Sequence, residues 1–387
     1  MKEWDVMNTP ALEARIDLSA VSHNIGVLRA HTSAGIVAVV KADGYGHGAV
    51  EVGRAALAAG AAQLGVTTIG EALELRRAGI TAPVLAWLHG GNADFGSAIE
   101  ADVQLGVSSS RELDAVVAAA RAAGRTASVT VKVDTGLARN GVHITEWDDT
   151  RDALAKAVAE QVITMHGVMS HLVRADEPDH PLNDLQTERL DEAADDLARV
   201  GAPVAVRHIA NSAATLTRPD LARDLVRPGI AVYGRSPIPE LGDFGLVPVM
   251  TLSAEVLSVK KIPAGQGVSY SHSWVAPNDT NVALLPAGYA DGVPRLLSNM
   301  LSVQINGHRY RNVGRICMDQ MVVDLGQNPA GVSAGDRAVL FGTGAGDGPT
   351  ALEWAEAIGT IDYEIVSGIR GRAVRTYVSG PITGEVV

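Results

Sequence analysis

The sequence has 387 residues, which is too many for one ordinary domain but suits a barrel of about 250 residues joined to a smaller domain. Its formal net charge of -12 argues against nucleic acid as a partner, because phosphate contacts need clustered Lys and Arg. Hydrophobic residues make up 47% of the sequence, yet no apolar run reaches the roughly 18 residues of a membrane helix, so we expect no membrane span. The single Cys317 excludes an intramolecular disulfide and the N-terminus lacks a signal-peptide pattern; both features predict a cytoplasmic protein.

Apolar strand-like runs alternate with helix-like segments in the first part of the sequence, which is typical of parallel βα units. The predicted strands are residues 35–40, 63–67, 83–87, 103–108, 128–134, 164–171, 204–209 and 225–233. Apolar residues at helical spacing lie between them, at residues 50–59, 69–78, 112–123, 147–159 and 185–200. The number of strands favours an α/β fold, a (β/α)8 TIM-type barrel over residues 13–245. The alternative is a doubly wound open sheet, which usually has fewer strands.

The pattern changes after about residue 245 to short alternating runs separated by Gly and Pro. Strands are predicted at residues 251–259, 281–285, 301–305, 321–324 and 338–341, with a helix at 352–358. Residues 246–387 therefore form a mainly β C-terminal domain in this interpretation. Residues 1–12 are expected to pack with it.

Lys41 stands at the end of the first predicted strand, where a glycine-rich turn begins. An amine at the end of a buried strand loses hydration, and this lowers its pKa toward the range of a nucleophile or base. Schiff-base formation with an aldehyde cofactor needs such an amine. The alternative is a lysine with its ammonium in water, and the local pattern alone does not decide between the two.

Polar residues recur at the ends of the other predicted strands, where the chemistry of barrels gathers. They are Lys132, Asp134 and Arg139 around strand five, His171 after strand six, His208, Asn211 and Ser212 after strand seven, and Arg227, Gly229 and Ile230 at strand eight. Barrels often hold a phosphate between the loops after strands seven and eight, which predicts a phosphate-bearing cofactor. Asn211 or Ser212 alone is more often a helix N-cap.

Several motifs occur together and in order along the sequence. They are Lys41-Ala-Asp-Gly-Tyr45-Gly-His-Gly48, Lys132-Val-Asp-Thr-Gly-Leu-Ala-Arg139-Asn-Gly141, His208-Ile-Ala-Asn211-Ser212, Val226-Arg227-Pro-Gly229-Ile230, Ser269-Tyr270, Gly288-Tyr289-Ala-Asp-Gly292, Cys317-Met318-Asp319 and Ile361-Asp-Tyr363-Glu364. With them the sequence closely resembles the alanine racemases, bacterial pyridoxal-phosphate enzymes of fold type III. The resemblance covers nearly the whole chain, and so many matches make coincidence negligible.

The resemblance implies a reaction, a cofactor and an assembly. The reaction is the interconversion of L-alanine and D-alanine by two bases on opposite faces of the substrate, supplying D-alanine for peptidoglycan. Pyridoxal 5'-phosphate is the implied cofactor, and no metal is expected. The implied assembly is a homodimer with shared active sites, to which Tyr270, Met318 and their neighbours come from the partner subunit.

The resemblance also implies residue roles. Lys41 would hold the cofactor and act as one base, and Tyr270 would act as the other. The residues implied around the cofactor are Tyr45, His171, His208, Asn211, Ser212, Arg227, Gly229, Ile230 and Tyr363. Arg139 and the Met318 amide would bind the substrate carboxylate, with Lys132 (as a carbamate), Tyr289, Cys317 and Asp319 in support. The alternatives are an ordinary ion pair for Lys132 and amphipathic packing for Tyr45 and Tyr363.

Two functions other than alanine racemisation are considered. One is a racemase of broader range acting on serine or other small amino acids, which the tyrosines at 289 and 363 disfavour because they resemble a gate that narrows access. The other is a non-catalytic protein that binds pyridoxal phosphate, which would be expected to lack one of the two bases. The sequence also departs from the family where Ser271 follows Tyr270, a position that is usually glycine.

Overall fold

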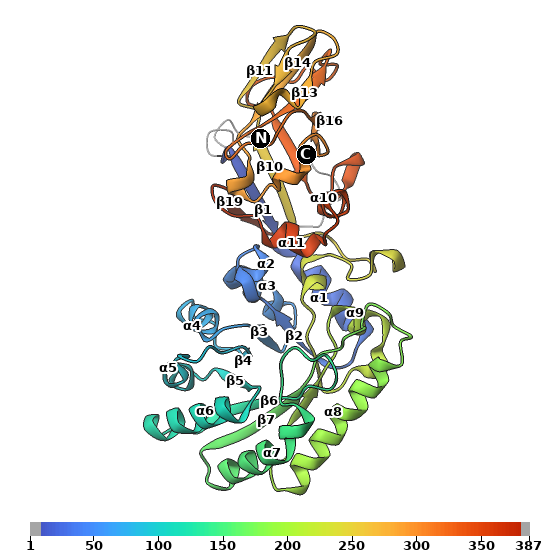
Figure 1. Ribbon diagram of the computed structural model, residues 1–387. Coiled ribbons are helices and arrows are strands. Elements are labelled where there is room, and N and C mark those ends of the chain that lie inside the picture. The colour runs from blue at the N-terminus through green and yellow to red at the C-terminus, as the bar shows by residue number, and fades with distance from the viewer. Residues whose placement is uncertain (1–8, 381–387) are drawn as a thin grey trace. The chain divides into compact units, whose positions relative to one another are not determined.

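The computed structural model describes residues 9–380 (Figure 1). They form two compact units. The barrel unit comprises Val21–Gly44 and Ala49–Leu246. Of the described residues, the sheet unit comprises 9–20, Tyr45–Gly48 and 247–380.

The barrel unit contains eight parallel strands in one sheet, in the order β8-β7-β6-β5-β4-β3-β2-β9. The strands are β2 (Gly35–Val39), β3 (Gln63–Val66), β4 (Val84–Ala86), β5 (Gln104–Val107), β6 (Ala127–Lys132), β7 (Ile163–Met169), β8 (Val206–His208) and β9 (Leu225–Val226). β3 and β4 are buried along their whole length, as expected for parallel strands covered on both faces.

The sheet closes on itself between β8 and β9. The Asp224 amide donates to the Arg207 carbonyl at 3.1 Å, and the Arg227 amide donates to the Ala210 carbonyl at 2.8 Å. On the other side β9 pairs with β2, so every strand has two neighbours. The predicted TIM-type barrel is confirmed, and the doubly wound open sheet is wrong.

Helices alternate with these strands and lie around them (Figure 1). They are α1 (Leu18–His31), α2 (Lys41–Tyr45), α3 (Ala49–Ala58), α4 (Ile69–Arg77), α5 (Phe95–Glu100), α6 (Ser110–Ala123), α7 (Ile144–Ala159), α8 (Leu182–Arg199) and α9 (Ser212–Thr217). Side chains cap several N-termini: Thr68 and Ser109 accept a backbone N–H three residues on, at the starts of α4 and α6.

The sheet unit is built on nine strands in the order β11-β14-β17-β16-β15-β18-β10-β1-β19. They are β1 (Leu12–Asp17), β10 (Met250–Glu255), β11 (Ser258–Ile262), β14 (Thr280–Leu285), β15 (Ser302–Ile305), β16 (His308–Asn312), β17 (Met321–Gly326), β18 (Arg337–Phe341) and β19 (Val374–Val378). A hairpin of β12 (Gly267–Val268) and β13 (Trp274–Val275) and two helices, α10 (Ala351–Ile358) and α11 (Asp362–Ser367), complete it. This confirms the mainly β C-terminal domain.

Some elements differ from the predictions. The run at 225–233 is a strand only at Leu225–Val226; Pro228 and Gly229 then interrupt it, and Ile230–Tyr233 is a 3-10 helix. The run at 251–259 is two strands, β10 and β11. Residues 12–17 pair with β10 and β19 in the sheet unit, although the predicted barrel range begins at residue 13. Of the predicted N-terminal segment, residues 1–8 lie outside the described residues.

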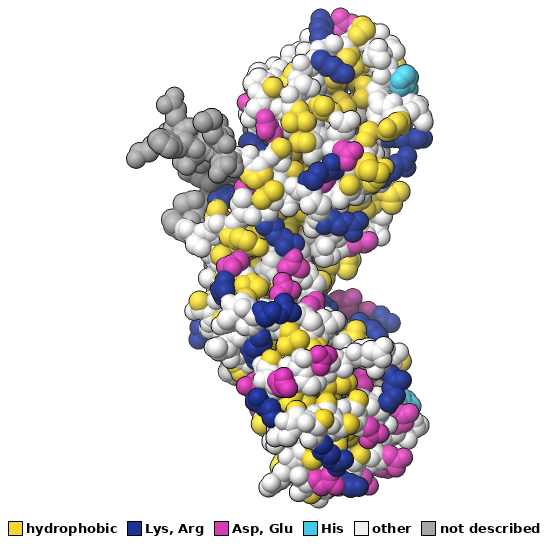
Figure 2. Space-filling model, turned by 90° about the vertical axis from the view of Figure 1, so that its left-hand side faces the viewer, with side chains coloured by type: hydrophobic (Ala, Val, Ile, Leu, Met, Phe, Trp, Pro, Cys, Tyr) yellow, Lys and Arg dark blue, Asp and Glu magenta, His cyan; other side chains and the backbone are white. Residues whose placement is uncertain are grey.

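Charged side chains of both signs are mixed on the surface drawn in Figure 2. On the face drawn in Figure 2, basic and acidic side chains are interspersed and neither sign covers a wide area. Between residues 9 and 380, no helix combines the length and the apolar character needed to cross a bilayer.

Two glycines, Gly124 and Gly26, have open space around the Cβ position but differ in backbone conformation, so alanine substitutions should affect stability in opposite directions. Gly124 ends α6 with a left-handed φ of 62°, whereas Gly26 lies inside α1. Gly124→Ala should therefore lower the free energy of unfolding by about 1 kcal/mol, because Ala resists φ > 0. Gly26→Ala should raise it by about 0.5–1 kcal/mol, because Ala suits a helix interior. Urea unfolding should give a lower midpoint for Gly124→Ala and a higher midpoint for Gly26→Ala. Shifts of the same sign would contradict the left-handed conformation of Gly124 or the helical conformation of Gly26.

Candidate functional site

The C-terminal ends of the barrel strands bring the predicted barrel residues together. Lys41 follows β2, Lys132 is the last residue of β6, His171 follows β7, His208 ends β8 and Arg227 follows β9. Lys41, Lys132, Arg139 and Arg227, here called the cationic cluster, are close enough for their charges to act on one another. The strand-end positions read from the sequence therefore do converge in space.

Arg227 is a buried cation whose hydrogen bonds go to neutral acceptors. Its guanidinium contacts His208 Nδ1 at 2.9 Å and donates to the carbonyls of His208 at 2.8 Å and Ser170 at 2.5 Å. A further contact reaches His171 Nδ1 at 3.4 Å. Among residues 9–380 no carboxylate forms an ion pair with Arg227, although its side chain is only 8% exposed. Burial lowers the pKa of Arg227 to about 10.

The pKa of Lys41 is lowered from its ordinary value. Burial is the main cause, and the nearby charge of Arg139 adds to it. Glu71 acts in the opposite direction and Arg227 lowers the pKa further. Lys41 is therefore less readily protonated than a fully hydrated lysine.

Lys132 is almost fully buried at the end of β6, with 9% of its surface exposed. Burial, Arg227 and Arg139 lower its pKa to about 8, against the opposing charge of Asp134. Within the described chain its ammonium forms no ion pair at 4 Å or less. The ordinary ion pair that the sequence left open for Lys132 is therefore not formed here.

The two histidines beside the cationic cluster, His171 and His208, are held neutral. Burial, followed by Arg227, lowers the pKa of His171 to about 3, and the same two causes hold the pKa of His208 well below its usual range. Because Arg227 is always a donor, Nδ1 of each ring is assigned as the acceptor and Nε2 carries the proton. His208 Nε2 is buried and has no hydrogen-bond partner among residues 9–380.

The loops after β8 and β9 meet at Ser212. Its hydroxyl accepts the amide of Gly229 at 2.9 Å and that of Ala231 at 3.3 Å, so its own proton points elsewhere. Ser212 and Gly229 are buried and Ile230 opens the 3-10 helix that follows. Asn211 caps α9 by accepting the Ala214 amide at 3.1 Å, which is the structural role that sequence reasoning had left open for it.

Gln186 of α8 is a buried residue near the site that sequence reasoning missed. Its amide nitrogen donates to Thr135 Oγ1 at 3.2 Å and to the His171 carbonyl at 3.1 Å, while its oxygen accepts the Val173 amide at 2.9 Å. It thus ties the segment after β6 to the segment after β7. Only its polar character at a buried helix position distinguishes it, and burial is not visible in one sequence.

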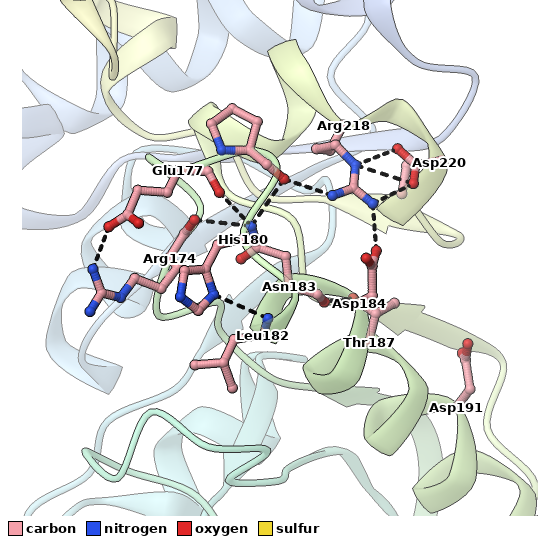
Figure 3. A network of polar contacts seen from close by, with 12 residues as sticks. Arg174, Glu177, His180, Leu182, Asn183, Asp184, Thr187, Asp191, Arg218 and Asp220 are labelled. Carbon is pink, nitrogen blue, oxygen red and sulfur yellow. Dashed lines mark hydrogen bonds and ion pairs between the residues drawn. The ribbon is translucent and has the colours of Figure 1, made fainter.

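The loop after His171 is anchored by the network in Figure 3. Asn183 Nδ2 donates to the carbonyls of Arg174 and Glu177, both at 3.0 Å, and Arg218 donates to the Pro178 carbonyl at 2.7 Å. Arg218 also pairs with Asp220 at 2.7 Å. These contacts hold the chain between β7 and α8 and so limit the freedom of His171.

The remaining predicted residues lie in the sheet unit. Tyr270 begins a 3-10 turn, Tyr270–His272, in which Ser271 has a φ of 59°, a conformation that suits glycine better. Tyr270 is 69% exposed and Met318 is 52% exposed. The rings of Tyr45 and Tyr363 lie 6.4 Å apart, and burial raises the pKa of Tyr45 to about 12.

Met318 lies in a loop that is braced on both sides. The Tyr289 amide donates to the Cys317 carbonyl at 3.1 Å, and the Ala290 amide donates to the Met318 carbonyl at 3.0 Å. Arg372 donates to Asp319 at 2.7 Å. Cys317, Met318, Asp319 and Tyr289 therefore lie together in the sheet unit.

Family models and known proteins agree on what the chain is similar to. Residues 16–237 match the model "Alanine racemase, N-terminal domain", and residues 249–377 match "Alanine racemase, C-terminal domain". The chain belongs to the alanine racemase family. It is 57% identical over 368 residues to the alanine racemase of Mycolicibacterium vanbaalenii, covering 95% of this chain and 94% of that one. To the alanine racemase of Mycobacterium tuberculosis it is 56% identical over 375 residues, covering 96% and 98%.

Solved structures of alanine racemases share the fold over nearly their whole length. The enzyme of Streptomyces lavendulae matches with a TM-score of 0.93 and 48% identity, covering 96% of this chain and 98% of that one. The enzyme of Streptomyces coelicolor matches with a TM-score of 0.92 and 45% identity, covering 97% and 100%. This membership makes the chain an enzyme, so the non-catalytic alternative is wrong.

The lowered pKa of Lys132 predicts how stability depends on pH. Between about pH 8 and its ordinary pKa of 10.5, Lys132 is more protonated in the unfolded chain than in the folded one, so stability due to this group rises with pH across that window. Lys132→Met removes the group and should flatten this rise. The check is urea unfolding of parent and variant, freed of bound small molecules, in carbonate-free buffers from pH 7.5 to 10.5. If the free energy of unfolding of parent and variant changed equally with pH, the lowered pKa of Lys132 would be contradicted.

Proposed function

We propose that this member of the alanine racemase family interconverts L-alanine and D-alanine by a two-base mechanism that depends on pyridoxal 5'-phosphate. The observation that carries the proposal is the convergence of Lys41, whose pKa is lowered, with three further cations, Lys132, Arg139 and Arg227, which form no ion pair within the described chain. Such a site suits a cofactor with an anionic phosphate and a substrate with a carboxylate. Supplying D-alanine for peptidoglycan in the cytoplasm is the proposed role.

The residues present fit the proposed cofactor. Ser212 and the loop from Gly229 offer a hydroxyl and backbone amides at the strand ends where barrels hold phosphate. The buried guanidinium of Arg227 fits a ring nitrogen, to which it would donate a hydrogen bond without giving up its proton. Lys41, Tyr45, His171, His208, Asn211, Ile230 and Tyr363 complete the proposed set. When bound, the cofactor supplies an aldehyde for amines and a ring that accepts electron density.

Lys41 and Tyr270 are the proposed bases. Lys41 Nζ takes or returns the α-proton on the D-alanine face, helped by its lowered pKa. The Tyr270 oxygen does the same on the opposite face. Forming a phenolate at pH 7 costs a tyrosine in water about 4 kcal/mol, by the usual conversion of about 1.36 kcal/mol per pKa unit. Neutral His171, with its proton on Nε2, is the proposed donor that offsets part of this cost.

The substrate carboxylate is assigned to Arg139 and the Met318 amide. Arginine suits this role because its planar fork matches a carboxylate. Lys132, with a pKa of about 8, has the neutral amine fraction that reaction with carbon dioxide requires, and as a carbamate it would orient Arg139 instead of repelling it. Tyr289 and Tyr363 are proposed to narrow access, which favours alanine over larger amino acids.

Tyr270 and Met318 are exposed in the single chain, which supports the proposal that they serve the active site of a second copy. The assembly would be a homodimer in which each site takes residues from both subunits. Full activity of a monomer at nanomolar concentration, checked by analytical ultracentrifugation with fluorescence detection, would contradict this.

The reaction is tested by incubating the purified enzyme with a panel of L-amino acids and reading the products by chiral chromatography. L-alanine should be the preferred substrate, and serine should react more slowly by at least about tenfold, because the proposed gate limits size. Equal rates on alanine, serine and larger residues would favour the broader racemase instead.

Substitution of the two bases separates their roles. Lys41→Ala should abolish racemisation together with the visible absorbance of the bound cofactor, whereas Lys156→Ala, an exposed lysine of α7, should leave both unchanged. Tyr270→Phe should keep the absorbance and lose racemisation by about 10²-fold or more. In deuterium oxide it should still exchange the α-proton of D-alanine but not that of L-alanine, measured by NMR. Exchange of both enantiomers would rule out the two-base assignment.

A further inference from the structure

We propose that Glu71 is a positioning residue that fixes the turn carrying Lys41. The inference rests on the proposed function, because it takes Lys41 as a catalytic amine. Glu71 lies in the first turn of α4, outside the set of residues assigned above. Its carboxylate bridges two neighbouring strand ends of the barrel.

The backbone after Lys41 has an uncommon conformation. Ala42, Asp43 and Gly44 have φ values of 52°, 51° and 62°, all left-handed, and Tyr45 follows with 51°. Non-glycine residues with a Cβ atom resist this region, so a left-handed run of this kind persists only where its surroundings hold it. The direction in which Lys41 leaves β2 therefore depends on contacts to this turn.

Glu71 supplies one of these contacts from a separate element. Its Oε1 accepts the Ala42 amide at 2.7 Å. Its Oε2 accepts the amides of Thr67 at 2.8 Å and Thr68 at 2.9 Å, which fixes the carboxylate against the end of β3. The turn is also closed locally, since the Gly44 amide donates to the Val40 carbonyl at 2.9 Å.

A role as helix cap does not account for both oxygens. α6 begins with a related arrangement, in which Glu112 Oε2 accepts the Ser108 amide at 2.7 Å and Ser109 caps the helix. That arrangement needs a single carboxylate oxygen. In α4 the second oxygen is turned to Ala42, which belongs to the preceding strand end.

The charge of Glu71 acts on Lys41 as well. It raises the pKa of Lys41, whereas burial, Arg139 and Arg227 lower it. Lys132 on β6 and His171 after β7 also face Lys41, and His171 is held neutral. Glu71 is a carboxylate that opposes the lowering of the Lys41 pKa, so the same side chain contacts the turn that carries Lys41 and acts on the charge of its amine.

The test uses Glu71→Gln with Thr68→Ala as its matched control, both as purified holoenzymes. In Glu71→Gln the remaining oxygen should stay with the two threonine amides and release Ala42. Thr68→Ala removes the hydroxyl that caps α4 but leaves the contact to Ala42. Hydrogen exchange measured by mass spectrometry reads the turn directly and does not depend on which reaction the enzyme performs.

We expect exchange over residues 41–45 to be faster by about tenfold or more in Glu71→Gln. In Thr68→Ala the increase should be confined to the first turn of α4. The kcat of alanine racemisation should fall about tenfold in Glu71→Gln, and the acid limb of its pH profile should move to lower pH. Thr68→Ala should keep the parental profile.

Parental exchange over residues 41–45 in Glu71→Gln, or an unmoved kcat profile, would overturn the proposal. If Glu71→Gln does not fold, Glu71→Asp keeps the charge but is too short to reach Ala42, and exchange over residues 41–45 then decides alone. A parent enzyme that fails to racemise alanine would overturn the proposed function, while the exchange data would still decide whether Glu71 holds the turn.

Discussion

Positive charge at one end of the barrel is the constraint on which the site depends. Lys41, Lys132, Arg139 and Arg227 act on one another there, and in the described chain none of the last three has a carboxylate partner at ion-pair distance. Burying unbalanced charge is costly, so such a cluster is stable only if it loses protons or binds anions. The lowered pKa values of Lys41 and Lys132 reflect a tendency to lose protons. A phosphate and a substrate carboxylate would be the bound anions.

The fold tolerates this cluster because it fixes the charges through backbone groups. Arg227 is held by carbonyl oxygens at the ends of β7 and β8, and Gln186 joins the loops after β6 and β7. Neutral acceptors leave the guanidinium its charge while satisfying its donors. Glu71 performs the matching task at the end of β2, where it holds a left-handed turn. Groups at the strand ends thus fix the positions of the charged side chains without neutralising them.

Much of this arrangement could be predicted from the sequence, because barrel strands are apolar runs and their last residues are polar. Lys41, Lys132, His208 and Arg227 follow from that pattern. Gln186 and Glu71 do not, since their roles depend on partners more than ten residues away, at His171 and Ala42. The left-handed turn was also hidden, because Ala42 carries no signal for positive φ and Asp43 only a weak one. Strand β1 was missed because its pairing partners, β10 and β19, come hundreds of residues later.

The central claim is that each active site combines Lys41 of one subunit with Tyr270 of its partner. Mixing Lys41→Ala with Tyr270→Phe, under conditions in which subunits exchange, tests it most directly. Half of the resulting dimers would be mixed, and each would contain one intact site and one doubly substituted site. The account predicts recovery of about a quarter of the parental racemase activity from two inactive parents. No recovery, with subunit exchange verified by native mass spectrometry, would contradict it.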